Sequence, residues 1–310
     1  MSSSLVTKAP EAAPVLTTRQ RTQLELVLRR FLRHRLAVGS LVLFLLIVLF
    51  AFVGPLLWKY DHIYIDGPSF SPPSAEYPLG TDQAGHDLLG QSMRGTQQSL
   101  KISLLVALIA TTFGSLWGAI AGFYRGWADT TISRLVDLTM AFPYLLFVIT
   151  LAGTLGSRLN HVTFGFLGEG VVTLVLVFGL LGWFYSARVM RSVALSIREK
   201  EFIEAARMVG ASNRRIIRSH VFPHLVGPLI VLATLNVAAF ILAEAGLSFL
   251  GLGIQLPTAS WGNLLADAPQ YYTSRPLLMV WPGVALLLTT LAFNLLGDGL
   301  RDAFDPRGSR

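Results

Sequence analysis

Six long apolar stretches constrain the fold of this chain more than any other feature of its sequence. A helix needs about 20 mainly apolar residues to cross the roughly 30 Å hydrocarbon core of a bilayer. The stretches cover residues 36–58, 102–124, 138–157, 170–187, 225–250 and 276–297. With 53% hydrophobic and 14% charged residues, the composition excludes an ordinary soluble protein. The sequence therefore predicts an all-α integral membrane protein with six transmembrane helices.

The basic residues are distributed unevenly between the two sides of these predicted helices. If the spans alternate in direction and the N-terminus is cytoplasmic, 20 Lys and Arg residues lie on the cytoplasmic side and 5 on the other. Cytoplasmic loops of membrane proteins are enriched in Lys and Arg, so both termini are predicted to be cytoplasmic. Topology accounts for the net charge of +7, and nucleic acid is not an expected partner.

The segments around the first span differ in their predicted character. Residues 1–20 are rich in Ser, Thr, Ala and Pro and are predicted to be a disordered cytoplasmic tail. Residues 21–35 have apolar side chains at helical spacing with arginines between them, which predicts an amphipathic helix on the inner membrane surface. A simple extension of the 36–58 span is the alternative. Residues 59–101 are expected to be extracytoplasmic, with Asp82 as the N-cap of a short helix.

Residues 102–297 are predicted to form a five-helix core, and residues 298–310 a cytoplasmic tail. The second span contains three glycines at i, i+4 and i+8, which are Gly114, Gly118 and Gly122. Small residues at this spacing let two helix backbones approach closely in lipid, so the stripe is predicted to face another helix. A direct role in a pore is the alternative. Asn236 and Asn294 are expected to form interhelical hydrogen bonds.

The basic loop at residues 188–224 is predicted to contain a helical hairpin on the cytoplasmic side. Residues 198–208 favour a helix, Gly210 suits the left-handed position that follows a helix, and Ser212 suits the N-cap of a second helix that ends at Pro223. Four apolar residues lie on this hairpin, namely Phe202, Ile203, Ala206 and Met208. Because exposed apolar patches mark interaction sites, a partner protein is expected to cover them.

Several motifs resemble those of one family of transport proteins. Glu204-Ala205-Ala206, Gly210, Ile216-Ile217 and residues 220–223 resemble the "EAA" loop of binding-protein-dependent ABC importer permeases. Further motifs resemble the C-type subunit of the peptide and nickel branch, and they lie at residues 29–41, 78–88, 126–143, 247–253, 260–262 and 297–307. The resemblance covers roughly residues 25–308. The sequence departs from the usual pattern at His86, Arg125 and His224, where the family commonly has Arg, Gly and Asn.

The resemblance implies a type I ABC importer permease fold in a bacterial inner (plasma) membrane. It implies import of short peptides, with nickel or another small solute as the alternative. The expected partners are a second homologous permease subunit, two ATP-binding subunits, an extracytoplasmic substrate-binding protein and the lipid bilayer. The hairpin is expected to couple motion of the ATP-binding subunits to alternating access through Phe202, Ile203, Glu204, Ala205, Ala206, Met208, Gly210 and Ser212.

The chain itself is expected to be neither an enzyme nor a cofactor-binding protein. None of its four lysines follows a glycine, so it has no phosphate-binding loop of the Gly-x-x-x-x-Gly-Lys type. ATP and Mg are therefore expected in partner subunits. The chain has no cysteine and no nucleophile motif, which argues against a membrane-embedded hydrolase. His220 and His224 are four residues apart, but Pro223 lies between them, and no metal site is predicted.

Glu244 is the one ionisable residue within the six predicted spans. A carboxylate at the centre of a span costs about 2.5–3.5 kcal/mol on insertion scales, so it marks a function or a specific partner. At a rise of 1.5 Å per residue, Glu244 lies about 29 Å beyond the cytoplasmic start of its span. It is expected either to line the translocation path or to make a structural hydrogen bond near the outer gate. A secondary transporter is the competing class of protein, although such carriers usually place ionisable groups near the midplane.

Overall fold

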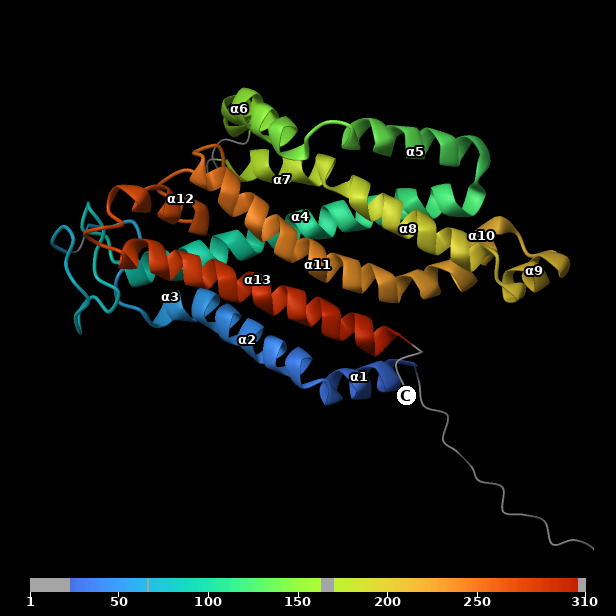
Figure 1. Ribbon diagram of the computed structural model, residues 1–310, viewed down its shortest axis with the longest axis horizontal. Coiled ribbons are helices and arrows are strands. Elements are labelled where there is room, and N and C mark those ends of the chain that lie inside the picture. Colours follow the sequence, from blue (N-terminus) through green and yellow to red (C-terminus); the bar gives the residue numbers. More distant parts are fainter. Residues whose placement is uncertain (1–22, 66, 163–169, 306–310) are drawn as a thin grey trace, which may run out of the picture.

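The computed structural model describes residues 23–65, 67–162 and 170–305. The predicted tail at 1–20 and the last part of the 298–310 tail lie outside the described residues. Within these ranges the chain is made of helices joined by turns and loops, with one isolated β-bridge between Thr81 and Asp87. The long helices lie side by side along the longest axis of the molecule (Figure 1), which agrees with an all-α membrane fold.

The helices follow the predicted spans in order, and several of them extend beyond the predicted ends. They are α1 (Gln23–Arg33), α2 (Arg35–Phe52), α3 (Gly54–Leu57), α4 (Leu88–Tyr124), α5 (Gly126–Met140), α6 (Tyr144–Val162), α7 (Val171–Leu181), α8 (Trp183–Arg198), α9 (Glu201–Met208), α10 (Asn213–Ile216), α11 (Phe222–Phe249), α12 (Trp261–Ala266) and α13 (Leu277–Phe304). A π-helical turn, Ile217–Val221, joins α10 to α11, and a 3₁₀ turn, Ala268–Gln270, follows α12. Five of the described helical segments can cross a membrane by length and composition, and the number is six if the bent α5–α6 pair is counted as one span.

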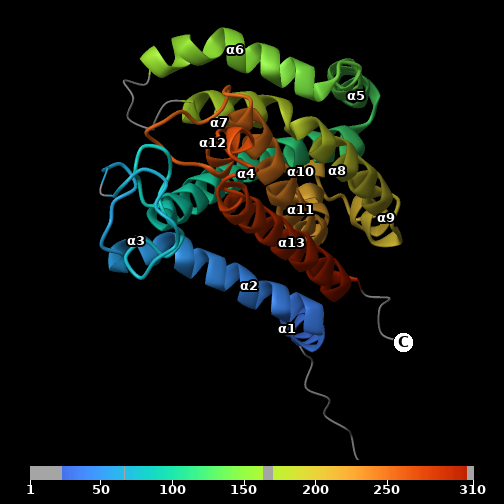
Figure 2. The ribbon, with the colours of Figure 1, turned by 60° about the vertical axis from the view of Figure 1, so that its left-hand side comes forward.

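The two ends of the bundle differ in content, and we name them accordingly. The hairpin end holds α9 and α10, together with α1 and the end of α13 (Figure 1). The loop end holds residues 58–87 and 250–276, which include α12. On opposite sides of the bundle between these ends lie the α1–α2 pair and the α5–α6 pair (Figure 2).

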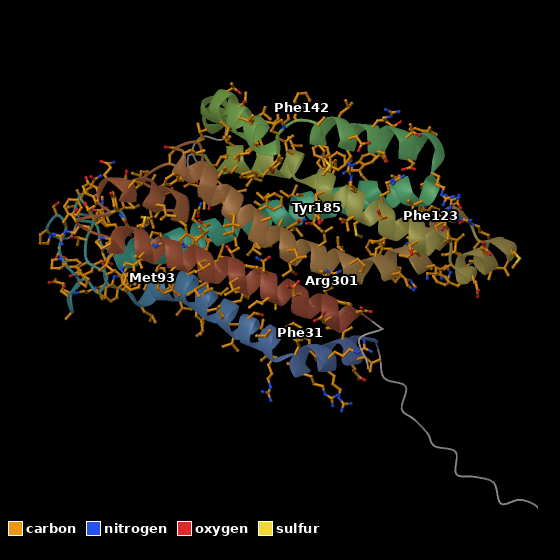
Figure 3. The ribbon with its side chains drawn as sticks, viewed as in Figure 1. Phe31, Met93, Phe123, Phe142, Tyr185 and Arg301 are labelled. Atoms are coloured by element: carbon orange, nitrogen blue, oxygen red, sulfur yellow. The ribbon has the colours of Figure 1, made fainter. Side chains whose placement is uncertain are left out.

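The first two helices are separate rather than one extended span. His34 lies between them in an extended conformation and its Nδ1 accepts the Ala37 N–H at 3.1 Å, which caps α2. Phe31 of α1 is buried against Ala303 of α13, whereas Leu32 is 58% exposed. Figure 3 labels Phe31 in this position beside the end of α13. An amphipathic α1 thus packs one face on the bundle and leaves apolar side chains on another, as a helix at a membrane surface requires.

The helix cap expected at Asp82 lies instead at Asp87, so that prediction is wrong. The Asp87 carboxylate accepts the Gly90 N–H at 2.8 Å and begins α4 there. Asp82 Oδ1 instead accepts the N–H groups of three consecutive loop residues, Ala84, Gly85 and His86. Gly85 has φ +95°, which a helix cannot contain. Residues 88–101 of the segment assigned to the 59–101 loop are therefore the first part of α4.

The third predicted span, residues 138–157, is not a straight helix. α5 ends at Met140, α6 begins at Tyr144, and their axes differ by 81°. The physical cause is Pro143, because proline lacks an N–H and disfavours the α conformation in the residue before it. Its carbonyl accepts the first helical bond of α6, from Phe147 N–H at 3.1 Å. A break of this kind gives the span two arms that can take different angles.

Pro223 does not end the second helix of the predicted hairpin, contrary to the prediction. Helical structure continues from Asn213 to Phe249 through the π-helical turn, in which the Phe222 N–H reaches the Ile217 carbonyl. A π turn widens the helix by one residue and so makes room for the proline ring. The continuous segment of 37 residues is about 55 Å long at 1.5 Å per residue. It therefore extends well beyond the hydrocarbon core of a bilayer.

The glycine stripe of α4 faces α8 at backbone contact distance. A Cβ added to Gly114 would lie 2.2 Å from the Trp183 carbonyl oxygen, and one added to Gly118 would lie 2.2 Å from that of Ala187. At Gly122 the Arg191 carbonyl oxygen would be 2.5 Å away. Only residues without a side chain permit this approach.

Asn236 of α11 is confirmed as an interhelical donor in the same region. Its Nδ2 donates to Thr111 Oγ1 of α4 at 2.8 Å and to Ser186 Oγ of α8 at 3.0 Å. One amide group thus joins three long helices within the buried part of the bundle, whereas Asn294 is exposed on α13.

Replacing Gly118 by alanine is expected to destabilise the protein by about 1–3 kcal/mol, because the new methyl group overlaps a backbone oxygen that cannot move freely. Gly283→Ala on α13 is the matched control, since nothing lies within 4 Å of its Cβ position. This control should be neutral or stabilising by up to about 1 kcal/mol. Thermal unfolding of the purified variants in detergent measures both effects, and equal stability of the two would contradict the close-contact interpretation.

Candidate docking hairpin

The hairpin formed by α9 and α10 projects from the bundle at the end of α8 (Figure 1). α9 has Glu201 and Glu204 in its first turn and Arg207 in its last turn. This charge order stabilises a short helix, because the N-terminus of a helix carries partial positive charge and its C-terminus partial negative charge. The sequence therefore favours a helix here independently of any partner.

The turn between the two helices depends on Gly210. Its φ is +77°, its N–H donates to the Arg207 carbonyl at 2.9 Å, and the Ala211 N–H donates to the Ala206 carbonyl at 3.0 Å. These two bonds form a Schellman motif, which needs the left-handed conformation that glycine adopts most easily. Ser212 Oγ accepts the Arg215 N–H and caps α10. The structure thus places Gly210 and Ser212 in the turn and cap roles expected for them.

The base of the hairpin belongs to the hydrophobic core. Ile203 and Ile216 are both fully buried, and they pack in one cluster whose other buried members are Phe123, Met190, Ile197, Val221, Leu225 and Leu232. The expectation that a partner covers Ile203 is therefore wrong, because this chain covers it. Ala206 also packs partly on this cluster. Helical spacing alone could not separate the two faces of so short a helix.

Polar and aromatic contacts fix the hairpin to its neighbours. Arg198 Nη1 donates to the Phe123 carbonyl of α4 at 2.6 Å, close to the position labelled in Figure 3. The Phe202 ring stacks on His224 of α11 with centroids 5.2 Å apart, and His224 Nδ1 bonds the His220 carbonyl at 2.7 Å. The two histidines therefore support the junction between hairpin and helix. Among the described residues, no group of three or more His, Cys, Asp or Glu could hold a metal ion.

The tip and outer face of the hairpin are exposed. Met208 is 83% exposed and Val209 is 85% exposed, while Glu204 and Ala205 are also exposed. Phe202 is 38% exposed beside its contact with His224. Val209 was not among the predicted docking residues. Its position directly before the turn glycine was the available signal, because side chains at such a turn point away from the helix body.

Three ion pairs connect α5, and the turn before it, to α8 and the base of the hairpin. Arg191 binds Asp129 through two bonds, Nε to Oδ1 at 2.5 Å and Nη2 to Oδ2 at 2.8 Å. Arg188 pairs with Asp137 at 2.6 Å, and Arg125 pairs with Glu199. These residues are far apart in sequence, so no spacing rule could have found them. They link the first arm of the bent span to the helix that carries the hairpin, where Ile132 and Val136 of α5 also pack in one cluster with Ala187 of α8.

Glu244 lies apart from the hairpin, towards the loop end of α11. Its side chain is 1% exposed, and Ser248 Oγ donates to its Oε1 at 2.7 Å. The structure therefore brings the eight predicted hairpin residues together but places Glu244 at a second, separate location. The described residues around the hairpin offer a rigid base and an exposed tip, an arrangement suited to transmitting movement.

Comparison with known proteins identifies the family. Residues 114–310 match the family described as binding-protein-dependent transport system inner membrane component. Residues 22–73 match the N-terminal transmembrane domain of oligopeptide transport permease C. Together the two matches include every motif of the resemblance except the one at residues 78–88.

Curated relatives match almost the whole chain. The oligopeptide transport system permease protein OppC of Mycobacterium tuberculosis is 44% identical over 91% of this chain and 94% of its own length. The dipeptide transport system permease protein DppC of Alkalihalophilus pseudofirmus is 37% identical over 89% of this chain and 87% of its own length. The nickel transport system permease protein NikC of Escherichia coli is also 37% identical, over 89% of this chain and 96% of its own length. The chain belongs to the family of binding-protein-dependent transport system inner membrane components.

Proposed function

We propose that this protein is a permease subunit of an ATP-driven ABC importer, and that an ATP-binding subunit docks on its α9–α10 hairpin. The observation that carries the proposal is the contrast between the buried Ile203 and the exposed Met208 and Val209 on the same short element. A tip that exposes large apolar side chains outside the membrane needs a protein partner. A base that is part of the core can pass the movement of that partner to the bundle.

Short peptides are the proposed substrate. The relatives at 37–44% identity include oligopeptide and dipeptide permeases, and of the three relatives described above, the oligopeptide permease has the highest identity. Nickel remains the alternative, because a nickel permease is 37% identical. Uptake assays with a labelled tripeptide and with ⁶³Ni, in cells that express the whole transport system, separate the two substrates.

The proposed complex contains a second homologous permease subunit, two ATP-binding subunits and an extracytoplasmic substrate-binding protein. ATP and Mg would be bound by the ATP-binding subunits. Glu204 would hydrogen-bond within the hairpin or to the docked subunit, and Ala205 and Ala206 would permit its close approach. Movement of the hairpin would displace α4, α8 and α11 together, since residues of all three form its supporting cluster. Such rigid-body displacement is a common route to alternating access.

A bacterial plasma membrane with the hairpin end in the cytoplasm is the proposed location. The 20 to 5 distribution of Lys and Arg supports this orientation. The first and last described helices, α1 and α13, have their outer termini at the hairpin end (Figure 1), so the N- and C-termini would share the cytoplasmic side. The loop end would then face the substrate-binding protein and contain the outer gate.

Gly210→Val tests the turn. A β-branched residue at φ +77° is disfavoured by about 1–2 kcal/mol or more, which would turn the exposed tip away from its docking position. We expect peptide uptake to fall by about tenfold, the factor that 1.4 kcal/mol represents. The measurement is uptake by cells that carry the variant as their only copy of this subunit.

Gly210→Asn is the matched control, because asparagine tolerates the left-handed conformation, and nothing lies within 4 Å of the Cβ position to obstruct it. It should retain most of the uptake. Normal uptake by the valine variant would refute the proposed coupling. Uptake by the chain without any ATP-binding subunit would favour a secondary transporter instead.

Shortening a side chain at the exposed tip is expected to weaken docking without affecting stability, whereas shortening one at the buried base is expected to reduce stability. Met208→Ala should change the unfolding free energy of the chain by less than about 0.5 kcal/mol and reduce the amount of ATP-binding subunit that copurifies. Ile203→Ala should destabilise the chain by about 2–5 kcal/mol, since it removes a fully buried side chain. Thermal unfolding and quantitative copurification measure the two effects. Unchanged copurification with Met208→Ala and Val209→Ala combined would show that the tip is not the docking surface.

A further inference from the structure

Glu244 lies where three elements of the loop end meet. It belongs to α11, and the hydroxyl groups of Ser248, Ser99 and Ser260 surround its carboxyl group. Ser248 is on α11, Ser99 is on α4, and Ser260 is the N-cap of α12. The Ser248 bond to Oε1 is short, at 2.7 Å. Oε2 has no partner within ordinary hydrogen-bonding distance among the described residues, so the Ser99 and Ser260 contacts are looser.

Residues 254–263 cover the loop end, and we call them the covering segment. Each of the three serine hydroxyl groups already accepts a backbone N–H from this segment. Ser248 Oγ accepts the Ile254 N–H at 3.0 Å, and Ser99 Oγ accepts the Trp261 N–H at 3.3 Å. Ser260 Oγ accepts the Asn263 N–H at 3.2 Å within a capping box. A serine hydroxyl has a single proton to donate. In all three serines that proton remains available for the same carboxylate.

Glu244 is therefore stabilised by a hydroxyl donor rather than by a cation. No ion pair of the described residues involves Glu244, although a buried carboxylate needs either a cation or hydrogen-bond donors. The Ser248 hydroxyl supplies one such donor at 2.7 Å, and the Ser99 and Ser260 hydroxyls lie near the same carboxyl group. Because a carboxylate only accepts hydrogen bonds, it fixes the direction of the two bonds through Ser248, from the Ile254 N–H to the serine and from the serine to Glu244.

The covering segment also packs closely against α4 and α11. Trp261 is fully buried, and its Nε1 donates to Thr96 Oγ1 of α4 at 3.1 Å. A Cβ added to Gly262 would lie 2.4 Å from the Ala245 carbonyl oxygen of α11, and one added to Gly253 would lie 2.2 Å from Ser248 Oγ. The start of α12 thus packs between α4 and α11, next to Glu244.

We propose that Glu244 is a positioning residue that latches residues 254–263 onto α4 and α11 and so keeps the loop end closed. The proposal rests on the proposed function only for the identification of the loop end as the outer gate. Glu244 would not contact the transported peptide in this closed arrangement, since it is fully enclosed by the chain. Opening of the gate would require the Ser248 bond to Glu244 and the bonds of the three serines to residues 254–263 to loosen together.

The absence of cysteine from the chain makes a direct test possible. Ala259→Cys places one thiol in the covering segment, at a residue that is 3% exposed. The test measures how fast a maleimide labels this thiol in the full chain, purified in detergent with the subunits that copurify and without ATP or peptide. In detergent both ends are accessible, so the orientation of the protein does not affect the result.

Glu244→Gln should accelerate labelling by about tenfold or more, because the amide replaces an acceptor of charge-assisted bonds with a group that also donates. The double variant Ser99→Ala/Ser260→Ala should act in the same direction. Ser103→Ala is the matched control, since Ser103 is a fully buried serine of α4 whose hydroxyl has no partner in the described residues. It should leave the labelling rate within about twofold of the parent, as expected for the loss of a hydroxyl that makes no bond.

A wild-type labelling rate in both Glu244→Gln and the double serine variant would overturn the latch. A raised KM for peptide in Glu244→Gln, with an unchanged labelling rate, would also overturn it and would place Glu244 in the translocation path. Adding Gly210→Val to the Ala259→Cys chain should leave labelling unchanged, because the test does not require ATP-driven movement. Failure of the hairpin proposal and failure of the latch are therefore distinguishable.

Discussion

The hydrophobic effect does not drive two helices together within a bilayer, because the surrounding lipid is as apolar as their side chains. The association of α4 and α8 therefore depends on direct packing contacts between them. The stripe of Gly114, Gly118 and Gly122 provides this contact, with added Cβ atoms only 2.2–2.5 Å from carbonyl oxygens of α8. Everything attached to α8 takes its position from this contact. α8 continues without interruption to Arg198, where the hairpin begins, and its arginines hold the first arm of the bent span.

Burial and polar contacts then define the two ends of the bundle. At the hairpin end an apolar cluster fixes the base of α9, and an exposed tip remains. At the loop end polar contacts are added to the packing of Trp261, with Ser248 bonded to Glu244 and Ser99 and Ser260 near its carboxyl group. The difference has a physical consequence. Apolar packing tolerates a rigid displacement of the whole cluster, whereas a set of directional hydrogen bonds holds only in one arrangement and is lost together when that arrangement changes.

The sequence predicted the class of fold and the general plan of the hairpin because these depend on local properties. Apolar length located the spans, and the special conformation of Gly210 located the turn. The errors arose where a local rule was overruled by neighbours that sequence does not reveal. Asp82 and Asp87 are both good helix caps, and only the fold of the loop around Gly85 selects the second. Ile203 and Met208 are both apolar, and only the cluster beneath α9 separates them.

The prolines also show that a local sequence rule does not determine where a helix ends. Pro143 breaks its span and Pro223 does not, although both occur in apolar, helix-favouring surroundings. A π turn at Ile217–Val221 comes directly before the segment that contains Pro223, whereas α5 ends three residues before Pro143. One continuous segment, Asn213–Phe249, carries the stacking contact of His224 with Phe202 near one end and Glu244 near the other. A displacement of the hairpin therefore acts on the same helix that holds the latch. Since a helix is stiff along its axis, the two ends of the molecule need no other connection for one to influence the other.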